Sequence, residues 1–307
     1  MDYCSYFISG KALFGSYPTQ EQVNELEKEG IGYFVNLTLP DEKGIESYTT
    51  TNSNTINFPI EDGKVPSDYI QFSKFILQIS HIITKELKPQ EKVYIHCKGG
   101  HARSGLVVAC LLCYIHKITP ERALRMTSEY HSNRKNLKEK WKKIGAPQTR
   151  HQKAYVMNMF KPIYFYRAYK TGSAIGFSNF SLHPVTLPDL GTFPTSESAF
   201  QVQKSPNDKD YIEKQKTAKN PAYSKIIGRH CKLREDWNEV RDKIMYKVVW
   251  YKFQQHPDIK QVLINSGLRP LYEHTHNDSY WGDGGDGSGQ NKLGRILMKI
   301  REKLILS

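Results

Sequence analysis

The stretch Val93-Tyr-Ile-His-Cys97-Lys-Gly-Gly-His-Ala-Arg103-Ser-Gly105 decides the architecture of the first half of the chain. An apolar run typical of a strand ends at Cys97, five residues follow, and Arg103 opens a run typical of a helix. A loop at such a strand-to-helix junction points backbone N–H groups at an oxyanion, and the helix dipole adds positive potential. Arg103 can hold two oxygens of that anion with its forked guanidinium. Because the same field favours the thiolate of Cys97, one element supplies both a nucleophile and an anion cradle.

The loop between Cys97 and Arg103 is the predicted phosphate-binding element. Its phosphate-binding residues are expected to be Lys98, Gly99, Gly100, His101, Ala102 and Arg103. The hydroxyl of Ser104 is expected to hydrogen-bond the Cys97 sulfur and to ease its later departure. Cys110 and Cys113 lie in an apolar helical run, so we expect them to be buried structural thiols.

These residues resemble the signature of the cysteine-dependent protein tyrosine phosphatases, especially the small dual-specificity branch. The signature is His-Cys, two residues, Gly, two residues, Arg and Ser/Thr, and this chain fills it with His96, Cys97, Gly100, Arg103 and Ser104. The resemblance implies phosphomonoester hydrolysis through a phosphocysteine intermediate. It also implies a phosphatase fold with a central, mostly parallel sheet.

Members of that family carry a general-acid aspartate on a loop upstream of the cysteine. Asp62, in Phe58-Pro-Ile-Glu-Asp-Gly63, is the expected acid, and Glu61 is the alternative. By resemblance, Asp62 protonates the leaving oxygen and then activates the water that hydrolyses the phosphocysteine. Gln152 is expected to help position that water.

Hydrophobic periodicity around the signature predicts an α/β domain. Strands are predicted at 33–37, 57–60 and 93–96, with helices at 20–29, 68–83, 104–115, 120–130 and 136–143. Turn residues near position 145 and an aromatic stretch after Pro162 place the domain boundary near residue 160. We therefore expect a phosphatase domain over 1–160 and a second domain over 161–307.

The predicted phosphatase domain has no long insertion for a deep phosphotyrosine-recognition loop. A shallow pocket that accepts varied phosphoesters is expected, with a phosphorylated protein, nucleotide, RNA or phosphoinositide as substrate. Lys98 and His101 inside the loop favour a highly charged substrate among these.

The second half contains four clusters in which aromatic residues alternate with carboxylates, amides and glycines. They are Gly176–Phe180, Thr195–Lys204, Arg234–Trp237, and Asp278–Gly282 followed by Gly289–Gly294. Helices are predicted at 197–204, 237–253 and 292–304. Glu197 and Lys204 are seven residues apart, almost two helical turns, and would share one helix face.

The four clusters resemble the NADAR family, which is related to bacterial riboflavin-pathway N-glycosidases, over roughly residues 163–305. The resemblance implies a mainly helical α+β domain that hydrolyses an N-glycosidic bond of a phosphoribosyl or ADP-ribosyl compound. By resemblance, the catalytic residues are Glu197, Asp278 and Lys204, and the substrate-binding residues are Asn179, Trp237, Trp281, Gly282 and Asn291. Two mechanisms remain open: a carboxylate that stabilises an oxocarbenium-like transition state, or a Schiff base formed by Lys204.

Composition and charge agree with a two-domain globular protein. The 307 residues are 38% hydrophobic, 24% charged and 12% aromatic, which excludes disordered, fibrous and membrane-embedded proteins. Lys and Arg outnumber Asp and Glu by 21 to 16 in residues 1–160 and by 23 to 15 in the rest, giving +13 in total. Such a balance favours anionic partners, and nucleic acid is a possible substrate.

Further expectations concern compartment, metal and the alternative functions. Five scattered cysteines, the absence of a signal-like N-terminus and short apolar runs indicate a cytoplasmic protein without a membrane span. His274, His276 and Asp278 do not match a metal-ligand pattern, so neither a metal nor another cofactor is expected. Two alternatives stay open: a phosphatase with a non-catalytic nucleotide- or ADP-ribose-binding module, and a nucleic-acid-binding protein.

Overall fold

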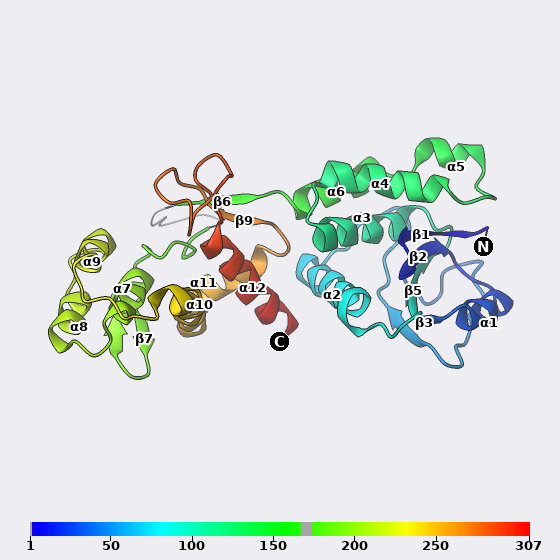
Figure 1. Ribbon diagram of the computed structural model, residues 1–307. Coiled ribbons are helices and arrows are strands. Elements are labelled where there is room, and N and C mark those ends of the chain that lie inside the picture. The colour runs from blue at the N-terminus through cyan, green and yellow to red at the C-terminus, as the bar shows by residue number, and fades with distance from the viewer. Residues whose placement is uncertain (1, 167–173) are drawn as a thin grey trace. The chain divides into compact units, whose positions relative to one another are not determined.

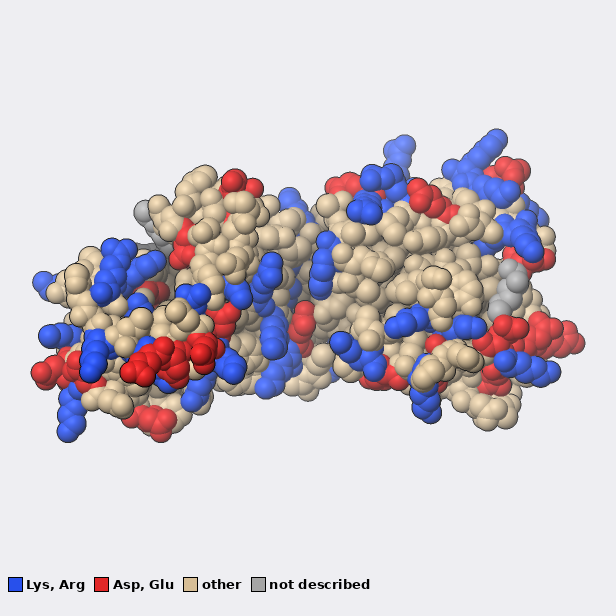
Figure 2. Space-filling model, in the orientation of Figure 1, with Lys and Arg blue, Asp and Glu red and all other residues tan. Residues whose placement is uncertain are grey.

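The computed structural model describes residues 2–166 and 174–307 and separates into two compact units (Figure 1). The first unit is Met1–Lys161 and the second is Pro162–Ser307. Figure 2 shows Lys and Arg side chains over the visible face of both units, with Asp and Glu between them. In the described residues there is no helix long and apolar enough to cross a membrane.

The first unit is built on one sheet that is mostly parallel, as predicted. Its strands are β1 (Cys4–Ile8), β2 (Ala12–Ser16), β3 (Ile31–Asn36), β4 (Asn54–Asn57) and β5 (Lys92–Cys97), in the order β1-β2-β5-β3-β4. β1 pairs antiparallel with β2, and the other pairs are parallel. The central strand β5 ends at Cys97, which is in register with Ser16 of β2. The carboxyl ends of parallel strands share one edge of a sheet, which is where ligands bind in α/β folds.

The strand predicted at 57–60 was wrong in position, because β4 ends at Asn57. Phe58 and Ile60 still donate backbone hydrogen bonds to β3 and the residue after it, at 2.9 and 3.1 Å. These two bonds go to consecutive carbonyls, Asn36 and Leu37, whereas a regular parallel ladder uses alternate ones, so the ladder ends here. The chain then turns into the loop that carries Asp62. β1 and β2 were not predicted.

Helices cover this sheet and fix the loop after β5. They are α1 (Gln20–Lys28), α2 (Tyr69–His81) with the π-helical turn η1 (Ile82–Glu86), α3 (Ala102–His116), α4 (Pro120–Ser132), α5 (Glu139–Ile144) and α6 (Arg150–Met159). α3 is buried from Ala102 to Cys113 and packs against β2, β5, α2, α4 and α6. Its apolar character on all sides is typical of a helix at the centre of a core. The helix therefore starts at a fixed position directly behind the loop.

The second unit is mainly helical, as predicted, with two small sheets. β6 (Ile163–Phe165) pairs parallel with β9 (Leu271–Glu273), and β7 (Val185–Leu187) pairs antiparallel with β8 (Gly191–Phe193). The helices are α7 (Ser196–Gln201), α8 (Lys209–Lys216), α9 (Pro221–Ile227), α10 (Trp237–Gln255), α11 (Pro257–Asn265) and α12 (Lys292–Leu306). The helix predicted over 197–204 ends at Gln201 and continues as the 3-10 turn η2 (Val202–Lys204).

A buried carboxylate orders the glycine-rich loop between β9 and α12. Asp283 accepts backbone hydrogen bonds from Thr275 and Gly285, and its other oxygen lies 2.8 Å from Nδ1 of His274. Gly284 and Gly285 adopt positive φ angles of 77° and 81°, which side chains disfavour. The loop is thus held in one course beside the end of β9.

Candidate active sites

Cys97 lies buried at the end of β5, where the loop to α3 begins. Its Sγ is 3.5 Å from Oγ of Ser104 in the first turn of α3. The loop packs tightly on β2: Gly100 has a φ of 72°, and a Cβ there would lie 2.4 Å from the carbonyl carbon of Gly15. Glycine is required at this position for both reasons.

Arg103 is fully buried, and Glu42 holds its guanidinium in a bidentate pair. Nη1 and Nη2 donate to the two Glu42 oxygens at 2.5 and 2.8 Å, and Nη1 also donates to the Ile60 carbonyl. The pKa of Glu42 lies below its ordinary value, chiefly because Arg103 donates to it. Nε of Arg103 is buried and has no partner in the described part of the chain, which leaves one charged donor for a ligand.

The sequence did not identify Glu42. It lies 61 residues before Arg103, in a turn without a local pattern. No motif links the two positions, and the pair becomes visible only in the folded chain.

The predicted acid Asp62 reaches the same arginine. Its Oδ1 lies 3.2 Å from Nη2 of Arg103, and its side chain is 72% exposed. The structure brings Asp62 to Arg103, whereas the neighbouring Glu61 accepts a backbone hydrogen bond from Lys64 through its carbonyl, and its side chain pairs with no described residue. Asp62 therefore contacts Arg103 and is open to solvent.

Gln152 is buried and already engaged. Its Oε1 accepts from the Thr149 N–H in a capping box, and its Nε2 donates to the Lys64 carbonyl at 3.0 Å. The Oε1 end thus caps α6, and the Nε2 end braces the loop after Asp62. This geometry offers no support for the expected water-positioning role.

Protein contacts also hold the side chains of Lys98 and His101 in the loop. Lys98 donates from Nζ to the Lys43 carbonyl at 2.6 Å. His101 lies 2.7 Å from His131 and stacks on Trp141 at 4.9 Å, and burial lowers the pKa of His101 to about 4. The buried Arg134 donates to the Gly100 carbonyl at 2.8 Å. The loop is held in place by these contacts, and His101 is uncharged at neutral pH.

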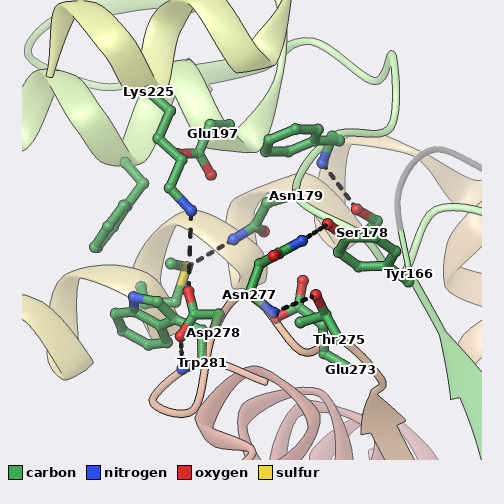
Figure 3. Close-up of a pocket in the computed structure, with 13 residues that line it drawn as sticks. Tyr166, Ser178, Asn179, Glu197, Lys225, Glu273, Thr275, Asn277, Asp278 and Trp281 are labelled. Carbon is green, nitrogen blue, oxygen red and sulfur yellow. Dashed lines mark hydrogen bonds and ion pairs between the residues drawn. The ribbon is translucent and has the colours of Figure 1, made fainter. Parts of the chain in front are cut away.

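The second unit contains a pocket of about 200 Å³ (Figure 3). Several separate segments line it: Tyr166, Ser178, Asn179, Phe180, Glu197, Phe200, Lys225, Met245, Glu273, Thr275, Asn277, Asp278 and Trp281. Four predicted residues, namely Asn179, Glu197, Asp278 and Trp281, are among them. Glu273 and Lys225 line the pocket but were not predicted.

Glu197 and Glu273 are the two carboxyl groups of this pocket whose pKa values are raised. Glu197, in the first turn of α7, is 7% exposed and accepts from Nε2 of Gln201 at 2.7 Å. Burial raises its pKa above the ordinary value. Glu273 ends β9, and burial, with the neighbouring Asp278 and Glu197, raises its pKa to about 8. Glu273 is therefore protonated at neutral pH.

Asp278 and Lys225 form the charged edge of the pocket. Oδ1 of Asp278 accepts the backbone N–H groups of Tyr280 and Trp281 at 3.0 and 2.8 Å. Its Oδ2 lies 3.9 Å from Nζ of Lys225, which reaches in from α9. In Figure 3, Lys225 and Glu197 come from neighbouring helices and approach the same space.

Asn179 offers the pocket an amide with spare hydrogen-bonding capacity. It is 6% exposed, its Nδ2 lies 3.2 Å from Sδ of Met245, and its Oδ1 has no partner among the residues described. A buried amide oxygen without a partner is costly unless a ligand donates to it.

The other predicted residues lie outside the pocket lining and support it. Trp237 packs on Phe200 with ring centroids 5.1 Å apart. Asn291 accepts from the Glu273 N–H at 3.0 Å and donates to the Leu271 carbonyl, so it fixes the end of β9. A Cβ on Gly282 would lie 2.7 Å from the Asp278 carbonyl oxygen, so only glycine fits beside that loop.

Lys204 is also absent from the pocket lining. Its Nζ donates to the Gly228 carbonyl at 3.0 Å and lies 5.8 Å from the Trp237 ring. The prediction that Lys204 shares a helix face with Glu197 was wrong. The α-helix ends at Gln201, and the chain then tightens into the 3-10 turn that ends at Lys204. The lysine in the pocket is Lys225. Within residues 2–166 and 174–307, no group of three or more His, Cys, Asp and Glu side chains is placed to hold a metal ion.

Comparison with known proteins assigns a family to each unit. Residues 13–145 match the family described as "Dual specificity phosphatase, catalytic domain", and residues 164–305 match the NADAR domain. "Putative tyrosine phosphatase 197R" of Invertebrate iridescent virus 6 is 34% identical over 310 residues, covering 98% of this chain and 94% of that protein. "Putative tyrosine phosphatase 067L" of Invertebrate iridescent virus 3 is 42% identical over 161 residues, 52% of this chain and 66% of that protein.

The second unit has its own relative. N-glycosidase YbiA of Escherichia coli (strain K12) is 40% identical over 141 residues, 45% of this chain and 87% of that protein. The NMR structure of the E. coli protein YbiA is 36% identical, covers 47% of this chain and 86% of its own, and has a TM-score of 0.42. The chain therefore belongs to the family of the viral protein 197R and combines a dual specificity phosphatase catalytic domain with a NADAR domain.

Proposed function

We propose that this chain is a bifunctional hydrolase. The first unit would hydrolyse phosphomonoesters through a phosphocysteine, and the second would hydrolyse the N-glycosidic bond of a phosphoribosyl or ADP-ribosyl compound. The observation that supports this most is that each unit holds its own set of reacting groups. Cys97, Arg103 and Asp62 meet in one unit, and Glu197, Glu273 and Asp278 meet in the other.

In the first unit, the Cys97 thiolate attacks phosphorus and the P–O bond to the leaving group breaks. The loop N–H groups and Nε of Arg103 bind the equatorial oxygens, where negative charge is concentrated. Asp62 gives its proton to the leaving oxygen. As a carboxylate it then takes a proton from water, which attacks phosphorus and releases phosphate from the sulfur. Ser104 donates a hydrogen bond to the departing thiolate.

The exposure of Asp62 supports an open phosphatase site. The acid is 72% exposed, so the groups around the scissile phosphate are not covered by a deep recognition pocket. Substrates would thus be chosen by their phosphomonoester group more than by the group that bears it. A phosphorylated protein, a nucleotide, an RNA 5′ end and a phosphoinositide all fit this class.

In the second unit, the C–N bond of the glycoside would break with positive charge developing at the anomeric carbon. The Glu197 carboxylate stabilises that oxocarbenium-like state, and Trp281 supplies an aromatic wall. Glu273, protonated at neutral pH, gives its proton to the leaving base. Water then adds to the anomeric carbon and returns a proton to Glu273.

This carboxylate route has more support than the Schiff-base route. Lys204 points its Nζ at the Gly228 carbonyl and lies outside the pocket lining, whereas Glu197 and Glu273 lie within it. A lysine nucleophile would have to be Lys225, whose Nζ faces the Asp278 carboxylate.

Paired variants of the full chain test the proposal. Cys97→Ser should abolish release of phosphate from an aryl phosphate and preserve release of base from N-glycosides. Glu197→Ala should do the reverse, and Glu213→Ala, at an exposed glutamate of α8, is the matched control. Binding of ADP-ribose by calorimetry without hydrolysis across a broad N-glycoside panel would reduce the second unit to a binding module. Loss of both activities in either variant would contradict two independent sites.

A further inference from the structure

Lys252 of α10 places its amino group inside the core of the second unit. The residue is 1% exposed, and its Nζ donates to the Ser178 carbonyl at 2.8 Å. Burial lowers its pKa to about 7, and no carboxylate in residues 2–166 and 174–307 pairs with it. An amino group buried without a counter-charge costs free energy, whereas an apolar side chain of this length would fill the space without that cost. The bond to Ser178 is thus the interaction that only the amino group supplies.

The carbonyl that Lys252 holds belongs to the turn that carries Asn179 into the pocket. Within this turn, the Ser181 N–H donates to the same Ser178 carbonyl at 3.2 Å, and the Phe180 N–H donates to Oγ of Ser178 at 3.1 Å. Ser178, Asn179 and Phe180 all line the pocket. The turn is therefore closed on itself, and the bond from Lys252 joins its main chain to α10.

A second hydrogen bond joins the same turn to the start of α7. The Glu197 N–H donates to the Asn179 carbonyl at 3.1 Å, one residue after the carbonyl that Lys252 holds. Figure 3 shows the side chains of Asn179 and Glu197 at the pocket. The turn is thus tied to α10 on one side and to α7 on the other. A shift of the turn would displace Asn179 and the backbone of Glu197 together.

The side chain of Asn179 contributes little to its own placement. Its Nδ2 lies 3.2 Å from Sδ of Met245, and a thioether sulfur is a weak acceptor. Its Oδ1 has no partner in the part of the chain that the structure describes. The direction of the amide therefore depends on where the main chain of the turn is held.

We propose that Lys252 is a positioning residue of the second site, which holds the Ser178 carbonyl and thereby places the Asn179 amide and the Glu197 carboxylate for the ribosyl group. The inference rests on the proposed N-glycosidase function and adds to it a residue that touches no substrate. Oδ1 of Asn179 accepts from a hydroxyl or N–H group of the ligand, and Glu197 faces the anomeric carbon. Both groups lose their position when the bond from Lys252 is lost.

Loss of this bond should weaken the site without weakening the fold. In Lys252→Met, the Ser178 carbonyl keeps its bond from the Ser181 N–H, so the carbonyl is not left without a partner. Replacing a buried amino group by an apolar group is neutral or stabilising when no partner is left unpaired. The unfolding midpoint of Lys252→Met should therefore stay the same or rise. A purely structural lysine predicts a lower midpoint.

Amide hydrogen exchange of the full chain tests the positioning role without any ligand. The amides of Ser181 and Glu197 donate into the turn, and both should exchange at least about tenfold faster in Lys252→Met than in the wild type. Amides of α12 should exchange at the wild-type rate in both proteins. Lys243→Met, at an exposed position of α10, is the matched control and should change none of these rates.

Binding and kinetics then measure the consequence for the site. Calorimetry should show that ADP-ribose binds about tenfold more weakly to Lys252→Met. For the N-glycoside that the wild type hydrolyses fastest, kcat/KM should fall by about 10–10²-fold, with kcat lowered and KM raised. Asn179→Ala should also weaken ADP-ribose binding, and the two losses should be less than additive in the double variant. Lys243→Met should bind and react like the wild type.

The possible failures are distinct. Wild-type exchange at Ser181 and Glu197 in Lys252→Met would overturn the positioning role. A lowered midpoint with wild-type affinity and kinetics of the folded fraction would overturn it too, because Lys252 would then be structural. Lys252→Leu repeats the test if the methionine variant does not fold, and failure of both to fold leads to the same structural conclusion. Failure of the proposed function is a different result, in which exchange rises and ADP-ribose binding weakens but the wild type hydrolyses no N-glycoside.

Discussion

The two candidate sites differ in how they are assembled and in the sign of their charge. The first uses one continuous run from Cys97 to Ser104, with Glu42 and Asp62 added from upstream loops, and it adds the guanidinium of Arg103 at the start of α3. The second takes its lining from separate segments between residues 166 and 281 and presents several carboxyl groups. A phosphoryl group carries negative charge in its transition state, and an N-glycoside develops positive charge at carbon. Each site thus opposes the charge that its proposed reaction creates.

Substitution of the nucleophile Cys97 should have the largest effect, and it should affect only the first of the two activities. Cys97→Ser should lower aryl phosphate hydrolysis by about 10⁴-fold or more, because serine is not ionised in a cradle built for a thiolate. N-glycoside hydrolysis in the same protein should stay at the wild-type rate. Turnover of the phosphate at the wild-type level would refute the phosphocysteine mechanism.

Substitution of the exposed Asp62 should have the second-largest effect. Asp62→Asn should slow hydrolysis of an alkyl phosphate by about 10²–10⁴-fold and that of p-nitrophenyl phosphate far less, because only the alkoxide needs a proton to leave. Kinetics with both substrates measure the difference. The neighbouring Glu61→Gln is the matched control and should change neither rate. Equal losses on both substrates in Asp62→Asn would move the acid role elsewhere, with Glu61 tested first.

Glu273, the proposed acid of the second unit, should show the same leaving-group dependence and, in addition, a pH dependence of its own. Glu273→Gln should lower hydrolysis of an N-glycoside with a neutral amine or purine leaving group by about 10²-fold. A nicotinamide N-glycoside should be much less affected, because its cationic ring leaves without a proton. For the wild type, kcat/KM on the neutral leaving group should fall as pH rises through about 8, the pKa of Glu273. A rate that stays flat to pH 9, or an equal loss on both glycosides, would assign the proton to another group.

The same residue predicts a pH dependence of stability. Folding raises the pKa of Glu273 from 4.5 to about 8, so between these values the folded state holds a proton that the unfolded state has lost. The free energy of unfolding should therefore fall as pH rises across this window and level off above it. Glu273→Gln should flatten this part of the profile, measured by denaturant unfolding at pH 5 and pH 8. A surface substitution, Glu213→Gln, should leave the slope unchanged.

The first site is built largely from consecutive residues and the second from separate segments, and this difference explains which parts could be predicted from the sequence. The strand, loop and helix around Cys97 are consecutive, and their geometry follows from local chemistry, so these three elements were predicted correctly. Lys204 was misplaced because helical periodicity was extended through residues that form a 3-10 turn, which has three residues per turn instead of 3.6. Glu273 was missed because β9 has only three residues, too few for a period-two pattern to appear. Lys225 and Glu42 have no local signal, since only the folded chain brings them to their partners.

The smallest of these effects tests a residue that acts through another. Glu42 touches no substrate in the proposed mechanism, but it fixes both Nη atoms of Arg103 and so aims the remaining Nε at the phosphate. Glu42→Gln keeps the shape and removes the charge, so the fork of Arg103 loses one of its two acceptors. We expect kcat/KM for an aryl phosphate to fall by about 10–10²-fold, the scale of a misplaced catalytic group, while the unfolding midpoint changes little.

A purely structural role for Glu42 predicts a different pattern. It would lower the unfolding midpoint and leave the kinetics of the folded fraction unchanged. Glu46→Gln, on an exposed side chain of the same loop, is the matched control and should alter neither quantity. Glu42→Asp should recover part of the activity, because a shorter carboxylate can still pair with one Nη atom. Wild-type kinetics in Glu42→Gln would show that the loop alone positions the buried arginine. Glu42 would then not be needed for the activity of the first site.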